Sequence, residues 1–253
     1  SLTAMVRDEV RITPAGDWLL DNYYLIEEQI RTARLHLPRG YSRELPSLAI
    51  GASAGLPRVF DLAMQAIAHG DGRVDAETMS RLTAAYQSVT PLKLGELWAI
   101  PIMLRLALIE NLRRMSVLIM RDSVEHGLAA EWAARLDDVA ERDPKSVVLV
   151  LADMARSNLP LTGPFVSELM RGLHGRSAAL AMPMSWIEQW VADGGHGAEQ
   201  LIHAASQQQA ADQVSISNSI GSLRFLINMN WREFVEALSI VERTLLEDPA
   251  RIY

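Results

Sequence analysis

The 253-residue sequence contains no cysteine. It therefore has no disulfide framework, no thiolate nucleophile and no cysteine-based metal site, which fits a reducing compartment. Lysine and arginine total 24 against 31 aspartates and glutamates, so the formal net charge is −7. This balance argues against a nucleic-acid-binding protein, which would present a basic face, and it does not favour binding to an anionic membrane surface.

Long apolar runs and targeting segments are missing as well. Residues 1–16 contain no apolar core of about 7–15 residues, so we do not expect a signal peptide there. No stretch reaches the roughly 20 consecutive apolar residues that cross a bilayer, so we expect a soluble chain without membrane insertion. Hydrophobic residues make up 49% and charged residues 22% of the sequence, which is typical of a globular protein.

Motifs for phosphate chemistry are also absent. The sequence has no Walker-type phosphate loop. It has no Asp-x-Asp pair, which many metal-dependent glycosyltransferases use to hold a nucleotide sugar. Gly51–Gly55 (GASAG) follows no predicted strand, so we reject a dinucleotide fingerprint and expect a loop.

Metal ligands do not cluster in the sequence. Asp71–Asp75 matches a calcium loop only in part, because Ala76 and Leu82 stand where the pattern requires glycine and glutamate. Glu199 and His203 are four residues apart, and two ligands alone do not make a zinc site. We therefore expect no metal and no cofactor.

The chain is organised around Pro91–Met120, where almost every residue from Leu97 to Ile109 is apolar. Such a run is too long for an ordinary strand and predicts a helix buried on nearly all sides. Pro101 predicts a kink or a break near Leu97–Pro101. Arg105 is the only charge in the apolar part, so a buried guanidinium there needs a carboxylate or carbonyl partner, and Glu96 or Glu110 could serve.

The remaining sequence predicts an all-α protein. Hydrophobic periodicity, caps and breakers indicate an irregular multi-helix bundle or solenoid-like stack of about ten helices, without a convincing strand. We expect residues 1–253 to form a single helical domain with a weak internal boundary near residues 159–164. The predicted N-caps are Asp17, Asp75, Ser185 and Asn230, and Gly127 is predicted to divide residues 121–142 into two helical pieces.

Some side chains are compatible with sugar binding, although each has a structural explanation. Trp186 and Trp190 lie on one helical face, and aromatic residues at this spacing either stack on a sugar ring or belong to a core. Tyr23 and Tyr24 present the same alternatives. Paired carboxylates for glycoside hydrolysis stay open, but the sequence gives no reason to choose a pair among three candidates: Glu44, Glu96 and Glu110.

A family resemblance is carried by several long segments. The main one is Leu94–Arg114 (LGELWAIPIMLRLALIENLRR). The others are Trp18–Asn22, Leu37–Tyr41, Arg43–Pro46, Leu56–Val59, Ala85–Gln87, Gln213–Arg224, Trp231–Val235 and Glu247–Pro249. Together they resemble the N-terminal region of the bacterial cyclic β-1,2-glucan synthases, over Trp18–Met120 and Gln213–Tyr253 and only loosely between these ranges.

This resemblance implies a place in a much larger enzyme. Cyclic β-1,2-glucan synthases are inner-membrane glycosyltransferases that polymerise glucose from UDP-glucose and cyclise the product for the periplasm. Their transferase carries Asp-x-Asp and Gln-x-x-Arg-Trp motifs, and neither occurs here. The resemblance therefore implies a soluble piece on the cytoplasmic face of the inner membrane, without the catalytic residues.

Two functions follow from the resemblance. The first is a non-catalytic scaffold or regulatory domain that packs on the glycosyltransferase domain or on a second copy, with Arg39, Arg43, Glu44, Trp98 and Arg105 as interface candidates. The second is a glycan- or UDP-glucose-binding, or hydrolase-like, helical domain with its own cleft, with Trp186 and Trp190 as glycan-stacking candidates. A cleft with aromatics and two facing carboxylates favours the second, and an exposed apolar patch favours the first.

Overall fold

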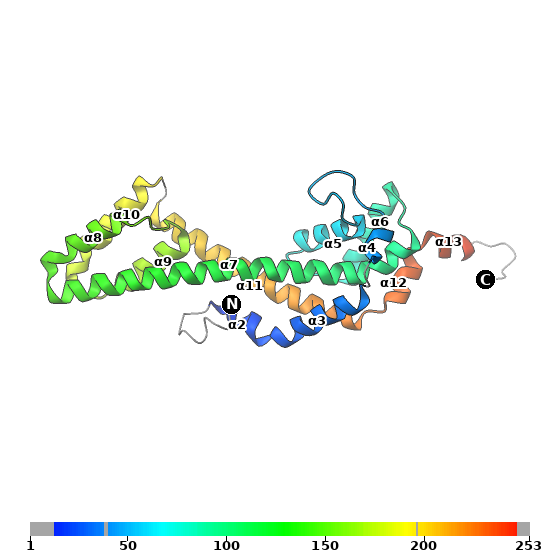
Figure 1. The fold of residues 1–253 in the computed structure, drawn as a ribbon, viewed down its shortest axis with the longest axis horizontal. Helices are drawn as coiled ribbons and strands as arrows, with labels where there is room; N and C mark the ends of the chain where they lie inside the picture. The colour runs from blue at the N-terminus through cyan, green and yellow to red at the C-terminus, as the bar shows by residue number, and fades with distance from the viewer. Residues whose placement is uncertain (1–12, 38–39, 196, 247–253) are drawn as a thin grey trace. The chain divides into compact units, whose positions relative to one another are not determined.

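The computed structural model describes residues 13–37, 40–195 and 197–246 (Figure 1). Within these ranges there are twelve α-helices, two short 3₁₀ helices and no strand. The one β-type contact among them is an isolated antiparallel bridge between Ser47 and Pro57. The predicted all-α fold is therefore confirmed.

The helices differ widely in length, and the two longest are α7 and α11. Their bounds, with the labels of Figure 1, are α2 (Pro14–Asp21), α3 (Tyr23–His36), α4 (Tyr41–Glu44), α5 (Arg58–His69), α6 (Ala76–Val89), α7 (Leu94–Arg142), α8 (Val147–Arg156), α9 (Gly163–Leu173), α10 (Ala181–Asp193), α11 (Ala198–Asn228), α12 (Trp231–Leu238) and α13 (Ile240–Leu246). The 3₁₀ helices are η1 (Pro144–Ser146) and η2 (Ala178–Leu180).

Two of the predicted helix caps are confirmed. The Asp75 side chain accepts a hydrogen bond of 2.8 Å from the amide nitrogen of Thr78 and caps α6. Asn230 caps α12 by accepting from the amide nitrogen of Glu233. Each cap satisfies an amide that has no partner inside the first turn of its helix.

The other two predicted caps are wrong. Asp17 lies inside α2, whose first turn is capped instead by the Thr13 hydroxyl, which accepts from the amide nitrogen of Gly16 at 3.3 Å. Ser185 lies inside α10, four residues after its start. Asn22 separates α2 from α3. A cap-forming residue type stays inside a helix when its flanking residues continue the helical pattern, because propensity is a weak signal.

Neither Pro101 nor Gly127 breaks α7, so the predicted division at Gly127 is wrong, while a kink near Pro101 stays a prediction. Around Pro101, the side chains of Ile100 and Leu104 are at most 2% exposed. Burying one such side chain contributes about 1.5–3 kcal/mol, so several together offset the roughly 3 kcal/mol that an interior proline costs. A glycine such as Gly127 costs only about 1 kcal/mol relative to alanine, which a long packed helix tolerates.

The chain divides into two compact units. Unit 1 comprises the described residues of 1–20 and 116–213, and unit 2 those of 21–115 and 214–253. Each unit is built from two separate stretches of the sequence, and residues 159–164 lie inside unit 1. The expectation of one domain stays a prediction.

Unit 1 has its own hydrophobic core. It is formed by side chains of α7 to α10, among them Leu136, Met154, Phe165, Leu169 and Ile187, none of which is measurably exposed. α8 begins with a valine-rich stretch, and it is a helix as predicted because its buried positions recur at helical spacing.

Unit 2 is centred on the first half of α7. Leu97, Leu104 and Leu108 of α7 are buried together with Ile67 of α5 and Ile220 of α11. Across all the described residues, no helix has the length and the apolarity needed to cross a lipid bilayer.

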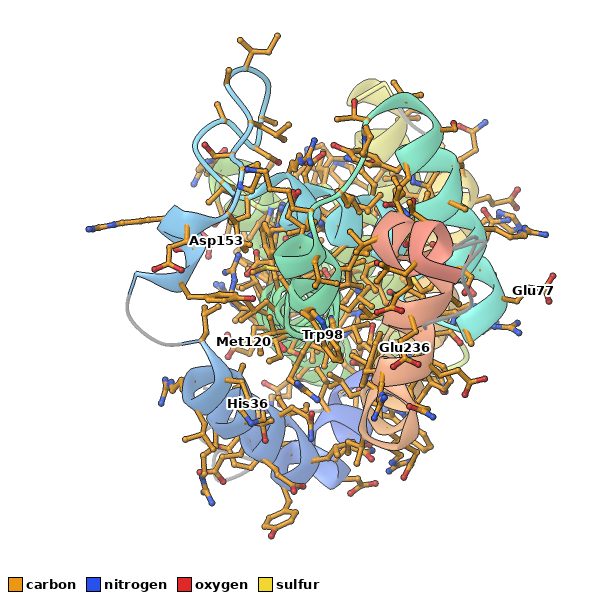
Figure 2. The ribbon with its side chains drawn as sticks, turned by 90° about the vertical axis from the view of Figure 1, so that its right-hand side faces the viewer. His36, Glu77, Trp98, Met120, Asp153 and Glu236 are labelled. Atoms are coloured by element: carbon orange, nitrogen blue, oxygen red, sulfur yellow. The ribbon has the colours of Figure 1, made fainter. Side chains whose placement is uncertain are left out.

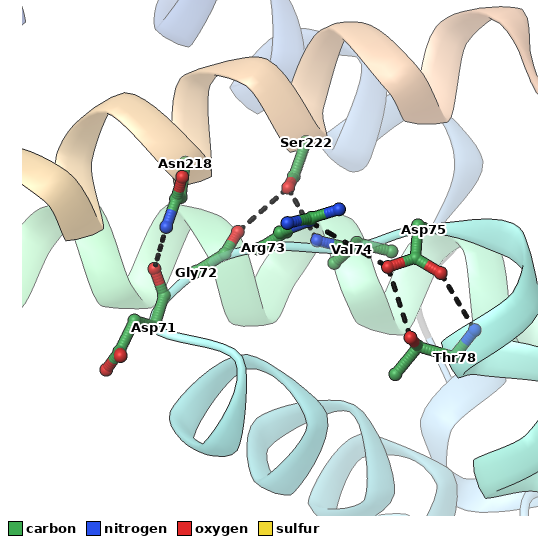
Figure 3. Close-up of polar contacts among 8 residues, drawn as sticks. All are labelled: Asp71, Gly72, Arg73, Val74, Asp75, Thr78, Asn218 and Ser222. Atoms are coloured by element: carbon green, nitrogen blue, oxygen red, sulfur yellow. Dashed lines mark hydrogen bonds and ion pairs between the residues drawn. The ribbon is translucent and has the colours of Figure 1, made fainter.

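Polar contacts fix the turn between α5 and α6 onto α11 within unit 2. Figure 3 shows the Ser222 hydroxyl between the carbonyl oxygen of Gly72 and the amide nitrogen of Val74, at 2.8 Å from each. Asn218 donates to the carbonyl oxygen of Asp71 at 3.1 Å. The buried main-chain groups of Gly72 and Val74 thereby obtain the partners that burial requires, while the contact of Asp71 with Asn218 is exposed.

Candidate functional site

The residues predicted to form an interface do not form one cluster of contacts. Arg39 lies outside the described residues. Arg43 and Glu44 are exposed on α4. Trp98 is 47% exposed in the second turn of α7 (Figure 2). Among the described residues, the side chains of these last three make no hydrogen bond or ion pair, so their interface role stays a prediction.

Arg105 is buried, and its partner is a side-chain carbonyl oxygen, one of the two predicted partner types, rather than Glu96 or Glu110. Its Nε donates to the amide oxygen of Gln29 on α3 at 2.8 Å, and Gln29 is only 2% exposed. Burial lowers the pKa of the Arg105 guanidinium. A neutral amide is a weaker partner than a carboxylate, so Arg105 joins α7 to α3 without an ion pair.

Glu96 is enclosed by Arg58 and is not exposed to solvent. The Nε and Nη2 atoms of Arg58 each lie 2.6 Å from one of its carboxylate oxygens, and Arg58 also donates to the carbonyl oxygen of Pro91 at 2.8 Å. The hydrogen bonds that Arg58 donates to Glu96 raise the pKa of the Arg58 guanidinium. Glu96 further accepts from the amide nitrogen of Lys93 and thereby caps α7.

The carboxylates considered for glycoside hydrolysis do not form a catalytic pair in this structure. Glu96 has no surface that a substrate can reach. Glu110 is ion-paired with Arg113 on the surface, and hydrogen bonds from Arg113 lower its pKa. A general acid needs a raised pKa, which is the opposite of this effect. Glu44 is exposed on a helix of only four residues.

Trp186 and Trp190 lie on one face of α10, as predicted. Their rings stack on each other, with centroids 5.4 Å apart and an angle of 24° between planes. Both pack against the core of unit 1. One face of each ring is therefore taken up by the other ring, and sugar stacking at these residues stays a prediction.

Unit 2 carries a groove of about 640 Å³ between α5 and α7, which we name the α5–α7 groove. Six of its eleven lining residues are apolar. Two carboxylates, Asp61 and Glu110, and one aromatic ring, Phe60, also line it. The full lining is Ser53, Leu56, Phe60, Asp61, Met64, Gln65, Ala68, Leu106, Ile109, Glu110 and Arg114.

Ser53 in this groove belongs to a pattern that sequence reasoning missed. Gly51–Gly55 reads Gly-x-Ser-x-Gly, the sequence of a nucleophile elbow. In a nucleophile elbow, the main-chain amide of the residue after the serine donates a hydrogen bond to the oxyanion of the substrate. The corresponding amide here, that of Ala54, donates instead to the carbonyl oxygen of Gly51. The Ser53 hydroxyl donates to Asp61 at 2.5 Å, and no histidine lines the groove. The geometry therefore does not support a serine nucleophile.

Unit 1 carries two adjoining cavities of about 300 and 270 Å³, which share four lining residues: Thr13, His126, Ser167 and Gln209. We name the pair the Asp122 cavity. The remaining lining residues are Pro14, Asp122, Pro164, Glu168, Arg171, Ile202, Ala205 and Ser206. No Trp, Tyr or Phe occurs among them, so the cavity does not match the aromatic cleft expected of a sugar-stacking site.

The walls of the Asp122 cavity come from α7, α9 and α11 and the start of α2. Gly163 allows α9 to approach α11, since a Cβ there would lie 2.7 Å from the carbonyl oxygen of Leu201 and 2.8 Å from the Cβ of Ala205. Thr162, just before α9, donates its hydroxyl hydrogen to Glu125 of α7. Asp122 and His126 stand four residues apart on α7, and therefore on one helical face.

Asp122 has an unusual electrostatic environment. Burial raises the pKa of its carboxyl, and the negative charges of Glu125 and Asp212 raise it further, whereas His126 and Arg121 lower it. Nothing in the sequence marked this residue, because the neighbours that shift its pKa include Asp212, ninety residues later in the chain.

Comparison with known proteins gives one informative match. The chain is 32% identical over 236 residues to the cyclic beta-(1,2)-glucan synthase NdvB of Rhizobium meliloti (strain 1021). The matched residues cover 93% of this chain and 8% of that protein. The chain is homologous to part of a cyclic β-(1,2)-glucan synthase. No family model matches it.

The match confirms the resemblance seen in the sequence segments. It also covers the intervening stretch that resembled the family only loosely, since 93% of the chain is aligned. The chain spans about one twelfth of the length of this relative.

Proposed function

We propose that this chain is a non-catalytic scaffold or regulatory segment of a cyclic β-(1,2)-glucan synthase. In this proposal the whole enzyme uses UDP-glucose at the cytoplasmic face of the bacterial inner membrane. The segment packs through unit 2 on the glycosyltransferase part of the same enzyme or on a second copy. The homology to a synthase supports the relation, and the observation that carries the scaffold role is the α5–α7 groove.

The groove suits protein docking better than catalysis. Its apolar side chains, including Phe60, Met64 and Ile109, are only partly buried in the described structure. Partly exposed apolar grooves commonly receive an apolar helix face from a partner. Its carboxylates are engaged, Asp61 with Ser53 and Glu110 with Arg113, so they form a polar rim.

The test compares two substitutions in the synthase that contains this segment. Met64→Glu places a charge inside the groove, whereas Leu35→Glu places the same charge on α3, where Leu35 is 77% exposed. We expect Met64→Glu to reduce glucan formation and the association of this chain with the remainder of the enzyme by about tenfold or more, and Leu35→Glu to change neither. Equal activity and association in both variants would overturn the docking proposal.

A second candidate function is glycan or UDP-glucose binding by the segment itself. The observation that favours it is the Asp122 cavity of unit 1, where polar side chains from several helices converge. Calorimetric titration of the chain with UDP-glucose, and separately with β-1,2-gluco-oligosaccharides, distinguishes it from scaffolding alone.

A further inference from the structure

We propose that the Asp122 cavity binds one pyranose ring of a neutral, polyhydroxylated ligand, with Asp122 and Gln209 as the orienting hydrogen-bond partners. This inference rests on the second candidate function and names its site and ligand class. It is independent of docking through the α5–α7 groove, because the groove belongs to unit 2 and the cavity to unit 1.

The first argument is the set of polar groups that line the cavity. A carboxyl group, an imidazole, an amide and hydroxyl groups come from three helices, supplied by Asp122, His126, Ser167, Ser206 and Gln209. This set includes both donors and acceptors, as the hydroxyl groups of a sugar require. A site for a phosphate would instead present mainly cationic groups and main-chain amides.

The second argument is that key groups have unused hydrogen-bonding capacity. Within the part of the chain that the structure describes, the side chains of Asp122, His126 and Ser167 make no hydrogen bond. Asp122 and His126 are each partly buried. Partly buried polar groups are normally satisfied by protein, water or ligand, so these groups are positioned for an external partner.

The third argument is an apolar wall beside the polar groups. Pro164, Ile202 and Ala205 line the same cavity as Asp122. A pyranose has one face of C–H groups and a rim of hydroxyl groups, so it matches a wall of this kind opposite hydrogen-bonding side chains. The cavities, of about 300 and 270 Å³, lie at the lower end of the range for small-molecule sites, which suits one or two rings rather than a long chain.

The charge balance explains why the ligand is neutral. The carboxylates near the cavity are Asp122, Glu125 and Asp212, together with Glu168. Glu168 is paired with Arg171, and Glu125 with Arg121. The remaining acidic groups repel an anion such as the diphosphate of a nucleotide sugar. A neutral glucan end therefore fits better than UDP.

The test is an NMR titration of the ¹⁵N-labelled chain with methyl β-D-glucopyranoside and with the β-1,2-linked disaccharide of glucose. We expect saturable shifts confined to residues lining the cavity, with a dissociation constant on the order of 1–10 mM for a single ring. Asp122→Ala and Gln209→Ala should each weaken binding about tenfold, the effect of losing one hydrogen bond to the ligand. Gln207→Ala, on the exposed side of the same helix as Gln209, should bind like the unchanged chain.

Two further arms define the ligand source. UDP-glucose that binds while UDP does not indicates recognition of the glucosyl unit. UDP that shifts the same residues as strongly as UDP-glucose overturns the assignment, because the nucleotide is then the recognised part. The proposal also fails if no saturable shift appears up to about 50 mM sugar, or if both Asp122→Ala and Gln209→Ala bind normally. Gln209 is exposed, so Gln209→Ala should not disturb the fold. This variant therefore tests the proposal even if Asp122→Ala fails to fold.

Failure of this experiment leaves the scaffold proposal intact. The Met64→Glu comparison probes the groove of unit 2 and contains no sugar-binding readout. Conversely, loss of docking in that comparison has no bearing on shifts within the cavity. The two outcomes are therefore distinguishable.

Discussion

The Ser222 hydroxyl donates a hydrogen bond to the carbonyl oxygen of Gly72, 150 residues earlier in the sequence, at 2.8 Å. The hydroxyl oxygen of Ser222 in turn accepts a hydrogen bond from the amide nitrogen of Val74. One serine therefore satisfies a donor and an acceptor of a buried turn. The serine-rich segment of α11 that carried the family resemblance thus acquires a structural role.

Replacing Ser222 with alanine should destabilise the protein by about 1–3 kcal/mol, because two buried main-chain groups lose their partner. The matched control is Ser217→Ala on the exposed face of the same helix, which should change the free energy of unfolding by less than about 0.5 kcal/mol. Urea denaturation of both variants measures the difference. Equal stability of the two would show that water replaces the hydroxyl.

Gly72→Ala should be more damaging than Ser222→Ala. Gly72 has a φ of +81°, and a Cβ there would lie 2.3 Å from the Ser219 hydroxyl oxygen and 2.7 Å from the carbonyl oxygen of Ser215. The left-handed conformation costs a side chain about 1–2 kcal/mol and the overlap about 1–3 kcal/mol more, so we expect a loss of about 2–5 kcal/mol.

The control for this glycine is Gly221→Ala inside α11. No atom lies within 4 Å of a Cβ built at Gly221. Alanine is the better helix former by about 0.8–1 kcal/mol, so this substitution should stabilise the protein. The two glycine variants should therefore shift the midpoint of thermal unfolding in opposite directions, and shifts of the same sign would contradict the structure.

Glu96→Gln should destabilise unit 2 strongly. It removes the charge that neutralises Arg58, whose side chain is only 14% exposed, and we expect a loss of about 3–5 kcal/mol. The exposed pair Glu77 and Arg81 is the control, since Glu77→Gln should change the unfolding free energy by less than about 1 kcal/mol. Glu96→Leu combined with Arg58→Met should recover much of the loss, because no uncompensated charge then remains buried.

Asp122 makes the stability of unit 1 depend on pH. Its pKa in the folded chain is raised above the ordinary value of 3.8, chiefly by burial. The folded state then binds more protons than the unfolded state between these two pKa values, so stability falls as pH rises through this window. The loss of stability caused by ionising Asp122 is absent below pH 3.8 and fully present above the raised pKa.

Asp122→Asn should therefore raise the free energy of unfolding at pH 7, and this advantage should shrink as pH falls towards 4. The exposed Asp138, paired with Arg142 on the surface of α7, provides the control Asp138→Asn, for which we expect little change across the same range. Chemical denaturation at a series of pH values gives the comparison. An advantage that grows as pH falls would have the wrong sign and would refute the burial of Asp122.

Sequence reasoning predicted the helical class and several helix bounds, because periodicity and caps are local. Asp75 caps α6 and Asn230 caps α12, as predicted. The continuity of α7 was not predictable in this way. Pro101 and Gly127 are local signals for a break, and the buried surface that overrides them depends on packing against distant segments.

The candidate sites were less accessible to sequence reasoning. The partner of Arg105 is Gln29, 76 residues away in the sequence. It was not predicted because the sequence does not distinguish this glutamine from any other polar residue. Likewise, Arg58 was not considered as the partner of Glu96, although both lie in segments that carried the family resemblance. The Asp122 cavity combines residues from four elements, and only folding brings them together.

The two-part construction of unit 2 has a consequence for the order in which the chain folds. Arg224 contacts Asn22 across 202 residues, and Ser222 contacts Gly72 across 150. On a ribosome, which releases the chain from its N-terminus, residues 116–213 emerge before these partners exist. The turn at Gly72 must then wait through the synthesis of about 150 further residues before its buried groups are satisfied, and contacts of such long range form slowly. A newly made chain therefore passes through a stage in which the apolar first half of α7 lacks the α11 residues that cover it.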